Sequence, residues 1–180
     1  MQLGRGGLLA GVRQVASPNR DARPPGAQVS LLVVHAISLP PGKFGGDSVE
    51  RLFTNRLDPG ADASFAELRT LRVSAHFFVR RDGEVIQFVA LGERAWHAGA
   101  STWRGRERCN DFSVGVELEG TDSAAFEDAQ YRRLADLTRA LQAALPLADA
   151  AGHSDIAPVR KSDPGPLFDW PRYLRLLSRA

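Results

Sequence analysis

The segment from Val29 to Ile37 constrains the fold most strongly, because it reads VSLLVVHAI and is apolar at nearly every position. A strand with one face in water alternates apolar and polar residues, whereas a continuous aliphatic run indicates a strand that is covered on both faces. The sequence therefore predicts a central sheet with other elements packed on both sides. His35 interrupts the run near its carboxyl end, where such sheets present functional groups.

Other segments supply the partners that this sheet needs. The patterns predict further strands over residues 73–79, 84–91, 112–119 and 147–151, and helices over residues 47–57, 127–145 and from 169 onward. This mixture predicts the α/β (mixed α+β) class, with one domain built on a central mixed sheet flanked by helices. Residues 1–28 are rich in Gly, Pro and Arg and are expected to form a partly irregular arm, so the domain proper spans residues 29–180.

The composition narrows the class of partner. The 180 residues carry a net charge of only +2, and the arginines are interleaved with acids, so we expect no nucleic acid to bind. No apolar run is long enough to span a bilayer, so we expect no membrane association either. A single cysteine, Cys109, suits a reducing compartment. We expect a cytoplasmic protein that acts as a monomer.

A second feature lies near the end of the chain, between Gly152 and Gly165. It contains His153, Lys161 and Asp163, and its prolines bar a continuous helix, so we expect a shaped loop. Each histidine of the chain, taken alone, could be a core residue with one hydrogen bond. His153 and Asp163 together with His35, however, would give two imidazoles, one carboxylate and an open position, which is a catalytic zinc arrangement.

Several motifs carry a resemblance to a known family. The segment from Gly152 to Trp170, GHSDIAPVRKSDPGPLFDW, resembles the end of the AmpD-type anhydromuramyl-L-alanine amidases. So do further segments that run from about Leu9 to Leu177, namely SPNRDARPPG, LLVVHAISLPPGKFGG, RVSAHF, RAWHAG and GRERCNDFSVGVELEGTD. The resemblance implies a peptidoglycan-recognition-like amidase fold and a Zn²⁺ ion held at the positions of His35, His153 and Asp163.

The resemblance also implies catalytic roles that the residues alone leave open. Alternation along residues 113–119 puts Glu117 and Glu119 on one face, which without context reads as a solvated strand face. The resemblance implies that Glu117, in preference to Glu119, is the catalytic acid–base group. Lys161 alone reads as a loop cation paired with Asp155 or Asp163. By resemblance, its ammonium stabilises the oxyanion of the tetrahedral intermediate.

Four further residues are candidates for substrate binding. Arg72 and Arg108 match family positions that resemble clamps for the carboxylates of the peptide stem, although each alone would be an ordinary surface arginine. Trp96 and His97 open a predicted loop, and His97 could line the substrate cleft. One position departs from the family pattern, because the residue after the first zinc histidine is usually Asn and here it is Ala36.

The function that the resemblance implies is zinc-dependent hydrolysis of one amide bond. This bond joins 1,6-anhydro-N-acetylmuramic acid to L-alanine of the stem peptide, and its cleavage belongs to cytoplasmic peptidoglycan recycling, with an anhydro-muropeptide as substrate. Two alternatives stay open: a non-catalytic muropeptide-binding module, marked by loss of a zinc ligand, and an exported amidase acting on intact peptidoglycan. The N-terminal segment is a poor signal peptide, which disfavours export.

Overall fold

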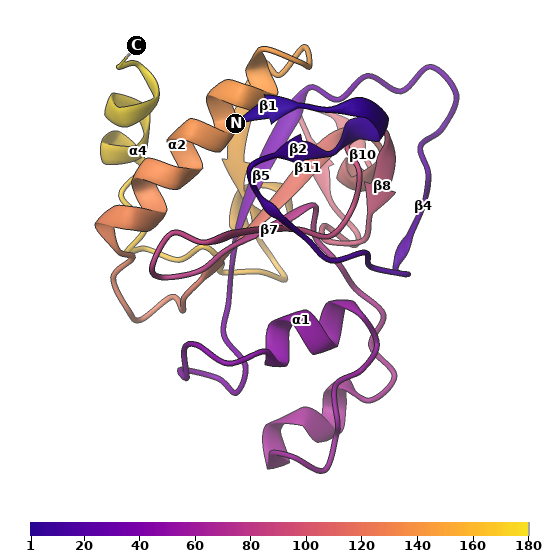
Figure 1. Cartoon of the computed structure of the whole chain (residues 1–180), viewed down its shortest axis with the longest axis vertical. Coiled ribbons are helices and arrows are strands. Elements are labelled where there is room, and N and C mark those ends of the chain that lie inside the picture. The colour runs from indigo at the N-terminus through magenta and orange to yellow at the C-terminus, as the bar shows by residue number, and fades with distance from the viewer. Residues whose placement is uncertain (180) are drawn as a thin grey trace.

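A six-stranded mixed sheet forms the centre of the computed structural model, which describes residues 1–179 (Figure 1). In spatial order its strands are β12 (Asp149–Gly152), β5 (Leu31–Ile37), β11 (Ser113–Glu119), β6 (Phe77–Val79), β7 (Val85–Gln87) and β3 (Arg13–Gln14). The strands from β12 to β6 are parallel, whereas β6 and β7 are antiparallel. The predicted mixed sheet is confirmed, and its parallel half brings the carboxyl ends of β12, β5 and β11 to one edge.

The remaining elements surround this sheet. The helices are α1 (Ser48–Phe53), α2 (Asp128–Gln142), α3 (His153–Ile156) and α4 (Trp170–Leu177), and the 3₁₀ turns are η1 (Arg5–Gly7), η2 (Ala63–Leu68) and η3 (Cys109–Asp111). The small antiparallel pairs are β1 (Gln2–Leu3) with β2 (Leu9–Ala10), β4 (Arg20–Ala22) with β8 (Glu93–Ala95), and β9 (Thr102–Trp103) with β10 (Arg106–Glu107). Within residues 1–179, no helix has the length and apolar character needed to cross a bilayer.

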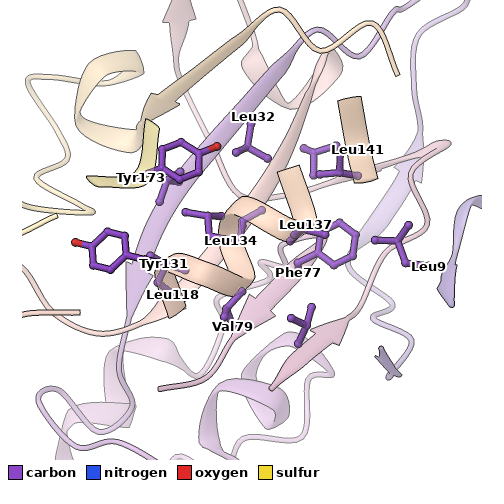
Figure 2. Packing of buried hydrophobic residues seen from close by; sticks show 14 of the residues in the cluster. Leu9, Leu32, Phe77, Val79, Leu118, Tyr131, Leu134, Leu137, Leu141 and Tyr173 are labelled. Atoms are coloured by element: carbon purple, nitrogen blue, oxygen red, sulfur yellow. The ribbon is translucent and has the colours of Figure 1, made fainter. Parts of the chain in front are cut away.

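Helices α2 and α4 cover one face of the sheet (Figures 1 and 2). On β5, Leu32 and Val34 point to this face and are fully buried. They pack in one cluster with Leu134, Leu137 and Leu141 of α2, whose spacing of three and four residues makes the apolar stripe. Burying each such side chain stabilises the fold by about 1.5–3 kcal/mol relative to leaving it exposed.

The opposite face carries two separate apolar clusters. Leu31 and Val33 of β5 belong to one cluster, whereas Ile37 packs against the other, which is built around α1. His35 lies between them on the same face, because side chains two residues apart along a strand share a face. The strand therefore places its one polar side chain in the gap between two apolar clusters.

The structure differs from the predicted elements where backbone groups find partners outside the sheet. Only Phe77–Val79 of the predicted segment 73–79 forms strand β6, because the carbonyl of Val73 accepts from the side-chain amide of Asn19 and the N–H of Ser74 donates to the carbonyl of Trp96. The segment after Gly152 begins with the single turn α3, which ends before Pro158. Residues 1–28 contain four short strands, and one of them, β3, joins the central sheet beside β7.

Candidate active site

Strands β5 and β11 place the first two site residues beside each other. In the parallel pairing of these strands, Glu117 is the direct partner of His35, so both side chains rise from the same face near the carboxyl ends of the strands. His35 is only 1% exposed. The pairing therefore sets a carboxylate next to a buried imidazole without any help from a loop.

The neighbouring strand β12 delivers His153, which is the first residue of α3. Gly152 just before it is tightly packed, since a Cβ there would lie 2.8 Å from Cδ of Pro164. This close approach lets the chain after α3 return to the site, where the N–H of Ser154 donates to the carbonyl of Asp163 at 2.8 Å. The return brings the carboxylate of Asp163 to the two histidines.

His35, His153 and Asp163 converge through one atom each. The Nδ1 atoms of the two histidines are 2.9 Å apart, and Oδ2 of Asp163 lies 3.2 Å from Nδ1 of His35 and 3.1 Å from Nδ1 of His153. A tetrahedral metal site with ligand distances of about 2.0–2.2 Å separates its ligand atoms by about 3.3–3.6 Å. The triangle matches that spacing to within a few tenths of an ångström.

The electrostatics of the triangle also suit a cation. Burial lowers the pKa of His35 to about 4, so its ring is neutral at neutral pH and offers a lone pair. Burial alone would raise the pKa of Asp163, but the ring nitrogens of His153 and His35 beside its carboxylate outweigh this effect and hold the pKa below its usual value. The neutral imidazole of His35 and the ionised carboxylate of Asp163 can therefore bind a metal ion without first losing protons.

The outer nitrogens of both rings are held by further groups. Nε2 of His153 lies 3.2 Å from the carbonyl oxygen of Ala98, and Nε2 of His35 lies 2.9 Å from Nδ1 of His97. Burial, followed by the neighbouring histidines, lowers the pKa of His97 well below its ordinary value, so this ring is also neutral. Such outer contacts fix the orientation of metal-binding histidines.

Glu117 has a buried oxygen with no partner. Its Oε2 is inaccessible to solvent and accepts no hydrogen bond in the described residues. Burial, reinforced by the charge of Asp163 and opposed by Lys161, raises the pKa of Glu117 well above its ordinary value. An unsatisfied buried carboxylate is costly to the fold, so its presence beside the metal-binding triangle points to a functional role.

Lys161 lies at the rim of the site and is exposed. The two acids that could have neutralised it are engaged elsewhere. Asp163 pairs with the histidines, and the carboxylate of Asp155 accepts from the backbone N–H of Gly152 at 2.7 Å. The ammonium of Lys161 is therefore available to a ligand.

A cavity of about 270 Å³ opens over the triangle. Its lining includes Glu117, Lys161, Trp96 and His97 together with His153 and Asp163, and its far wall is apolar, formed by Leu39, Leu52, Phe53, Leu68, Leu71 and Val73. Arg72 and Arg108 lie outside this lining and are exposed. The guanidinium of Arg108 pairs with Asp111 at 3.3 Å, whereas that of Arg72 donates to nearby backbone carbonyls.

Sequence reasoning missed two polar residues that position the site. The side-chain oxygen of Asn110 accepts from the backbone N–H groups of His97 and Ala98, at 3.1 and 2.8 Å. The hydroxyl of Ser113 lies 3.2 Å from Nε2 of His97. Ser113 could have been found, because strand alternation puts it on the same face as Glu117. Asn110 gives no such signal, since it lies in a turn.

Comparison with known proteins agrees with this site. The family model described as N-acetylmuramoyl-L-alanine amidase matches residues 25–166. The 1,6-anhydro-N-acetylmuramyl-L-alanine amidase AmpD of Salmonella typhimurium is 58% identical over 96% of this chain and 93% of that protein. The AmpD of Escherichia coli is 57% identical over 96% of both chains.

Solved structures extend the similarity to the fold. A crystal structure of a selenomethionine AmpD derivative superposes with a TM-score of 0.96 at 55% identity, covering 99% of this chain and 100% of that one. The amidase AmiD from Escherichia coli, solved with a muropeptide substrate, gives a TM-score of 0.61 at 32% identity and covers 86% of this chain and 60% of that one. The chain therefore belongs to the N-acetylmuramoyl-L-alanine amidase family and, within it, to the AmpD-type 1,6-anhydro-N-acetylmuramyl-L-alanine amidases.

Proposed function

We propose that this protein is a zinc-dependent amidase that cleaves the bond between 1,6-anhydro-N-acetylmuramic acid and L-alanine of the stem peptide. The observation that carries the proposal is the convergence of His35, His153 and Asp163 beside the unpaired carboxylate of Glu117. The name of the AmpD relatives, 1,6-anhydro-N-acetylmuramyl-L-alanine amidase, supports the identity of the cleaved bond and of the sugar. The substrate in the AmiD structure, anhydro-N-acetylmuramic acid-L-Ala-D-gamma-Glu-L-Lys, supports the same substrate class.

Zinc bound by these three residues would supply Lewis-acid activation of water and of the scissile carbonyl. The fourth position of such a site would be open, because residues 1–179 bring three possible ligands together at this place. In this proposal, Glu117 takes a proton from the attacking water and gives it to the nitrogen of the departing L-alanine. Its raised pKa suits both tasks, since a group that must accept and then donate a proton works best near neutral pH.

Lys161 completes the proposed machinery. Its ammonium lines the same cavity as Glu117 and is not held by an acid of the surrounding loop. Aimed at the carbonyl oxygen, it stabilises the negative charge that develops there in the transition state. We propose further that the four exposed or cavity-lining candidates Arg72, Trp96, His97 and Arg108 surround the bound substrate, as the family resemblance implies.

The proposed setting is cytoplasmic recycling of wall fragments, with soluble anhydro-muropeptide as the substrate and a single chain as the active unit. A module that only binds muropeptide would have no use for the three-ligand set or for the buried carboxylate oxygen of Glu117 that has no partner among the described residues. Both features are present, so catalysis is the better supported function.

The decisive experiment incubates purified protein with anhydro-muropeptide and follows the products by mass spectrometry. We expect release of the intact peptide with L-alanine at its amino terminus, loss of activity after chelation, and recovery on adding zinc. His153→Ala should lose both zinc and activity, as elemental analysis and the same assay would report. Cleavage that survives full metal removal, or a His153→Ala variant that keeps its zinc, would contradict the proposal.

A further inference from the structure

His97 is part of a chain of polar contacts that begins at His35 and runs away from the cavity. Its Nδ1 lies 2.9 Å from Nε2 of His35, and its Nε2 lies 3.2 Å from Oγ of Ser113. Oγ of Ser113 in turn lies 2.6 Å from the carbonyl oxygen of Cys109. Every member of the chain is buried, and His97 is only 9% exposed, so water does not compete for these contacts.

The carbonyl of Cys109, at the end of this series of hydrogen bonds, fixes the direction of every bond in the series. The carbonyl of Cys109 can only accept, so the single hydroxyl hydrogen of Ser113 points to it. Oγ of Ser113 must then accept from Nε2–H of His97. A neutral imidazole has one N–H, so Nδ1 of His97 is bare and accepts from Nε2–H of His35.

These hydrogen-bond directions determine whether Nδ1 of His35, the atom in the metal-binding triangle, carries a hydrogen. With its hydrogen on Nε2, His35 must present a bare Nδ1 to Nδ1 of His153 and Oδ2 of Asp163. We propose that Ser113 and His97 are positioning residues that select this tautomer of His35 and so prepare its lone pair for the metal. The proposal rests on the proposed zinc function and assigns to His97 a positioning role behind the ligand.

The surroundings of His97 hold its ring in this place. Asn110 accepts from its backbone N–H, as described above, and fixes the main chain at that point. Gly115 leaves the space that the ring occupies, since a Cβ at Gly115 would lie 2.4 Å from Cγ of His97. Ser113, Gly115 and Glu117 lie on one face of β11. This single strand therefore supplies the hydroxyl that accepts from His97, the space for the ring of His97 and the carboxylate of Glu117.

The outer nitrogen of His153 also contacts an acceptor. Its Nε2 lies 3.2 Å from the carbonyl oxygen of Ala98, which can only accept, so Nε2 carries a hydrogen and the neutral form of the ring has a bare Nδ1. In the neutral forms of both rings, the two Nδ1 atoms, which lie 2.9 Å apart, would have no hydrogen between them. A cation between these atoms would relieve the repulsion of their lone pairs, so the outer contacts of both histidines favour metal binding.

The test measures the tautomers and the metal separately. In the metal-free protein labelled with ¹⁵N-histidine, two-bond ¹H–¹⁵N correlation spectra report which nitrogen of each ring carries the hydrogen. We expect the Nε2–H form for both His35 and His97 in the wild type. In Ser113→Ala the fixed end of the chain is lost, so His97 and His35 should show mixed tautomers. Zinc affinity, measured by competition with a chelator, should fall about 10- to 100-fold, as for other outer contacts of metal ligands.

Two further variants and a control complete the design. His97→Phe keeps a ring and removes the acceptor, so it should lower zinc affinity to a similar degree, whereas Ser113→Thr restores the hydroxyl and should recover the Nε2–H tautomer. Ser17→Ala is the control, because Ser17 is an equally buried serine whose hydroxyl donates to the carbonyl of Phe53 and contacts none of the metal-binding side chains. Its zinc affinity should stay within about twofold of the wild type.

The possible failures are distinguishable. A wild type that binds no zinc overturns the proposed zinc function, while the tautomer spectra of the metal-free protein still test the chain of contacts. A wild type with the hydrogen of His35 on Nδ1 overturns the present inference. So does wild-type zinc affinity in both Ser113→Ala and His97→Phe.

Discussion

Glu117 stands directly opposite His35 in the parallel pairing of β11 with β5. A slip of one residue in this register would replace Glu117 by Leu118 and turn the carboxylate to the α2 side of the sheet. The relation is secured by the apolar residues that flank both positions, because Val34 and Val116 are fully buried under α2. The catalytic geometry proposed here is thus held by the hydrophobic core.

Replacing Glu117 by Gln should stabilise the metal-free protein while it impairs catalysis. The raised pKa of Glu117 means that its folded state favours the neutral acid, so its stabilising effect is present below the ordinary value of 4.5 and is lost as the pH rises through the raised pKa. Gln does not ionise, so the variant does not lose this stability as the pH rises. We expect a gain of about 1–3 kcal/mol in the free energy of unfolding at neutral or higher pH and almost none near pH 4. Urea denaturation at the two pH values measures it.

The same Glu117→Gln variant should lose activity by roughly a hundredfold or more in kcat, because it can no longer take or return a proton. Its zinc content should match the wild type. Equal activity of Glu117→Gln and wild type would remove Glu117 from the mechanism.

Glu119→Gln should have the opposite effect on stability. The carboxylate of Glu119 is 4% exposed and accepts from the backbone N–H groups of Gly45, at 2.5 Å, and Arg81, at 3.1 Å. An amide can satisfy only one of these donors and turns its own NH₂ group toward the other. We expect a loss of about 1–3 kcal/mol in stability and faster hydrogen exchange in residues 39–46. An effect on kcat larger than that of Glu117→Gln would instead make Glu119 the catalytic acid.

Lys161→Met should lower kcat by roughly a hundredfold while leaving zinc content unchanged, because it removes a charge that acts on the transition state and no ligand. The chain offers a matched control in Lys43, its other lysine, which is exposed and pairs with Asp62 at 3.6 Å. Lys43→Met should keep wild-type kcat. A comparison of kcat and metal content for both variants decides the point, and equal kcat values would mean that Lys161 is only a surface cation.

Ala36→Asn should raise kcat/KM by about fivefold, the equivalent of one neutral hydrogen bond of about 1 kcal/mol. Ala36 pairs with Leu118, on the opposite face of β5 from His35, and it lines both the cavity and an adjacent groove with Ser38 and Lys161. An amide there can reach a bound ligand without disturbing the metal site.

The control for Ala36→Asn is Ala150→Asn, because Ala150 packs against the same core cluster but does not line the cavity or the adjacent groove. That change should affect stability alone. If Ala36→Asn raises the melting temperature and leaves kcat/KM unchanged, the position has a structural role.

Local patterns in the sequence were enough to predict the sheet and its main helix. The apolar run that ends at Ile37 and the leucine stripe of α2 are set by burial, which acts on each segment through its own periodicity. The predictions were wrong where backbone groups pair with distant residues, as in Val73 and Ser74, because no local pattern records such partners. The turn α3 was missed for a related reason, since one helical turn fits ahead of Pro158 without any apolar period.

The sequence alone determined which residue types are available to the site, and the family resemblance singled out His35, His153 and Asp163. Only the tertiary structure decided that these side chains meet, since His35 and His153 are separated by 118 positions along the chain. It also decided which nitrogen of each ring faces the others, and that Oε2 of Glu117 has no hydrogen-bond partner among the described residues. The physical reason is that periodicity records only which face of an element is buried. Distances, hydrogen-bond directions and pKa values depend on groups that packing brings together from remote segments.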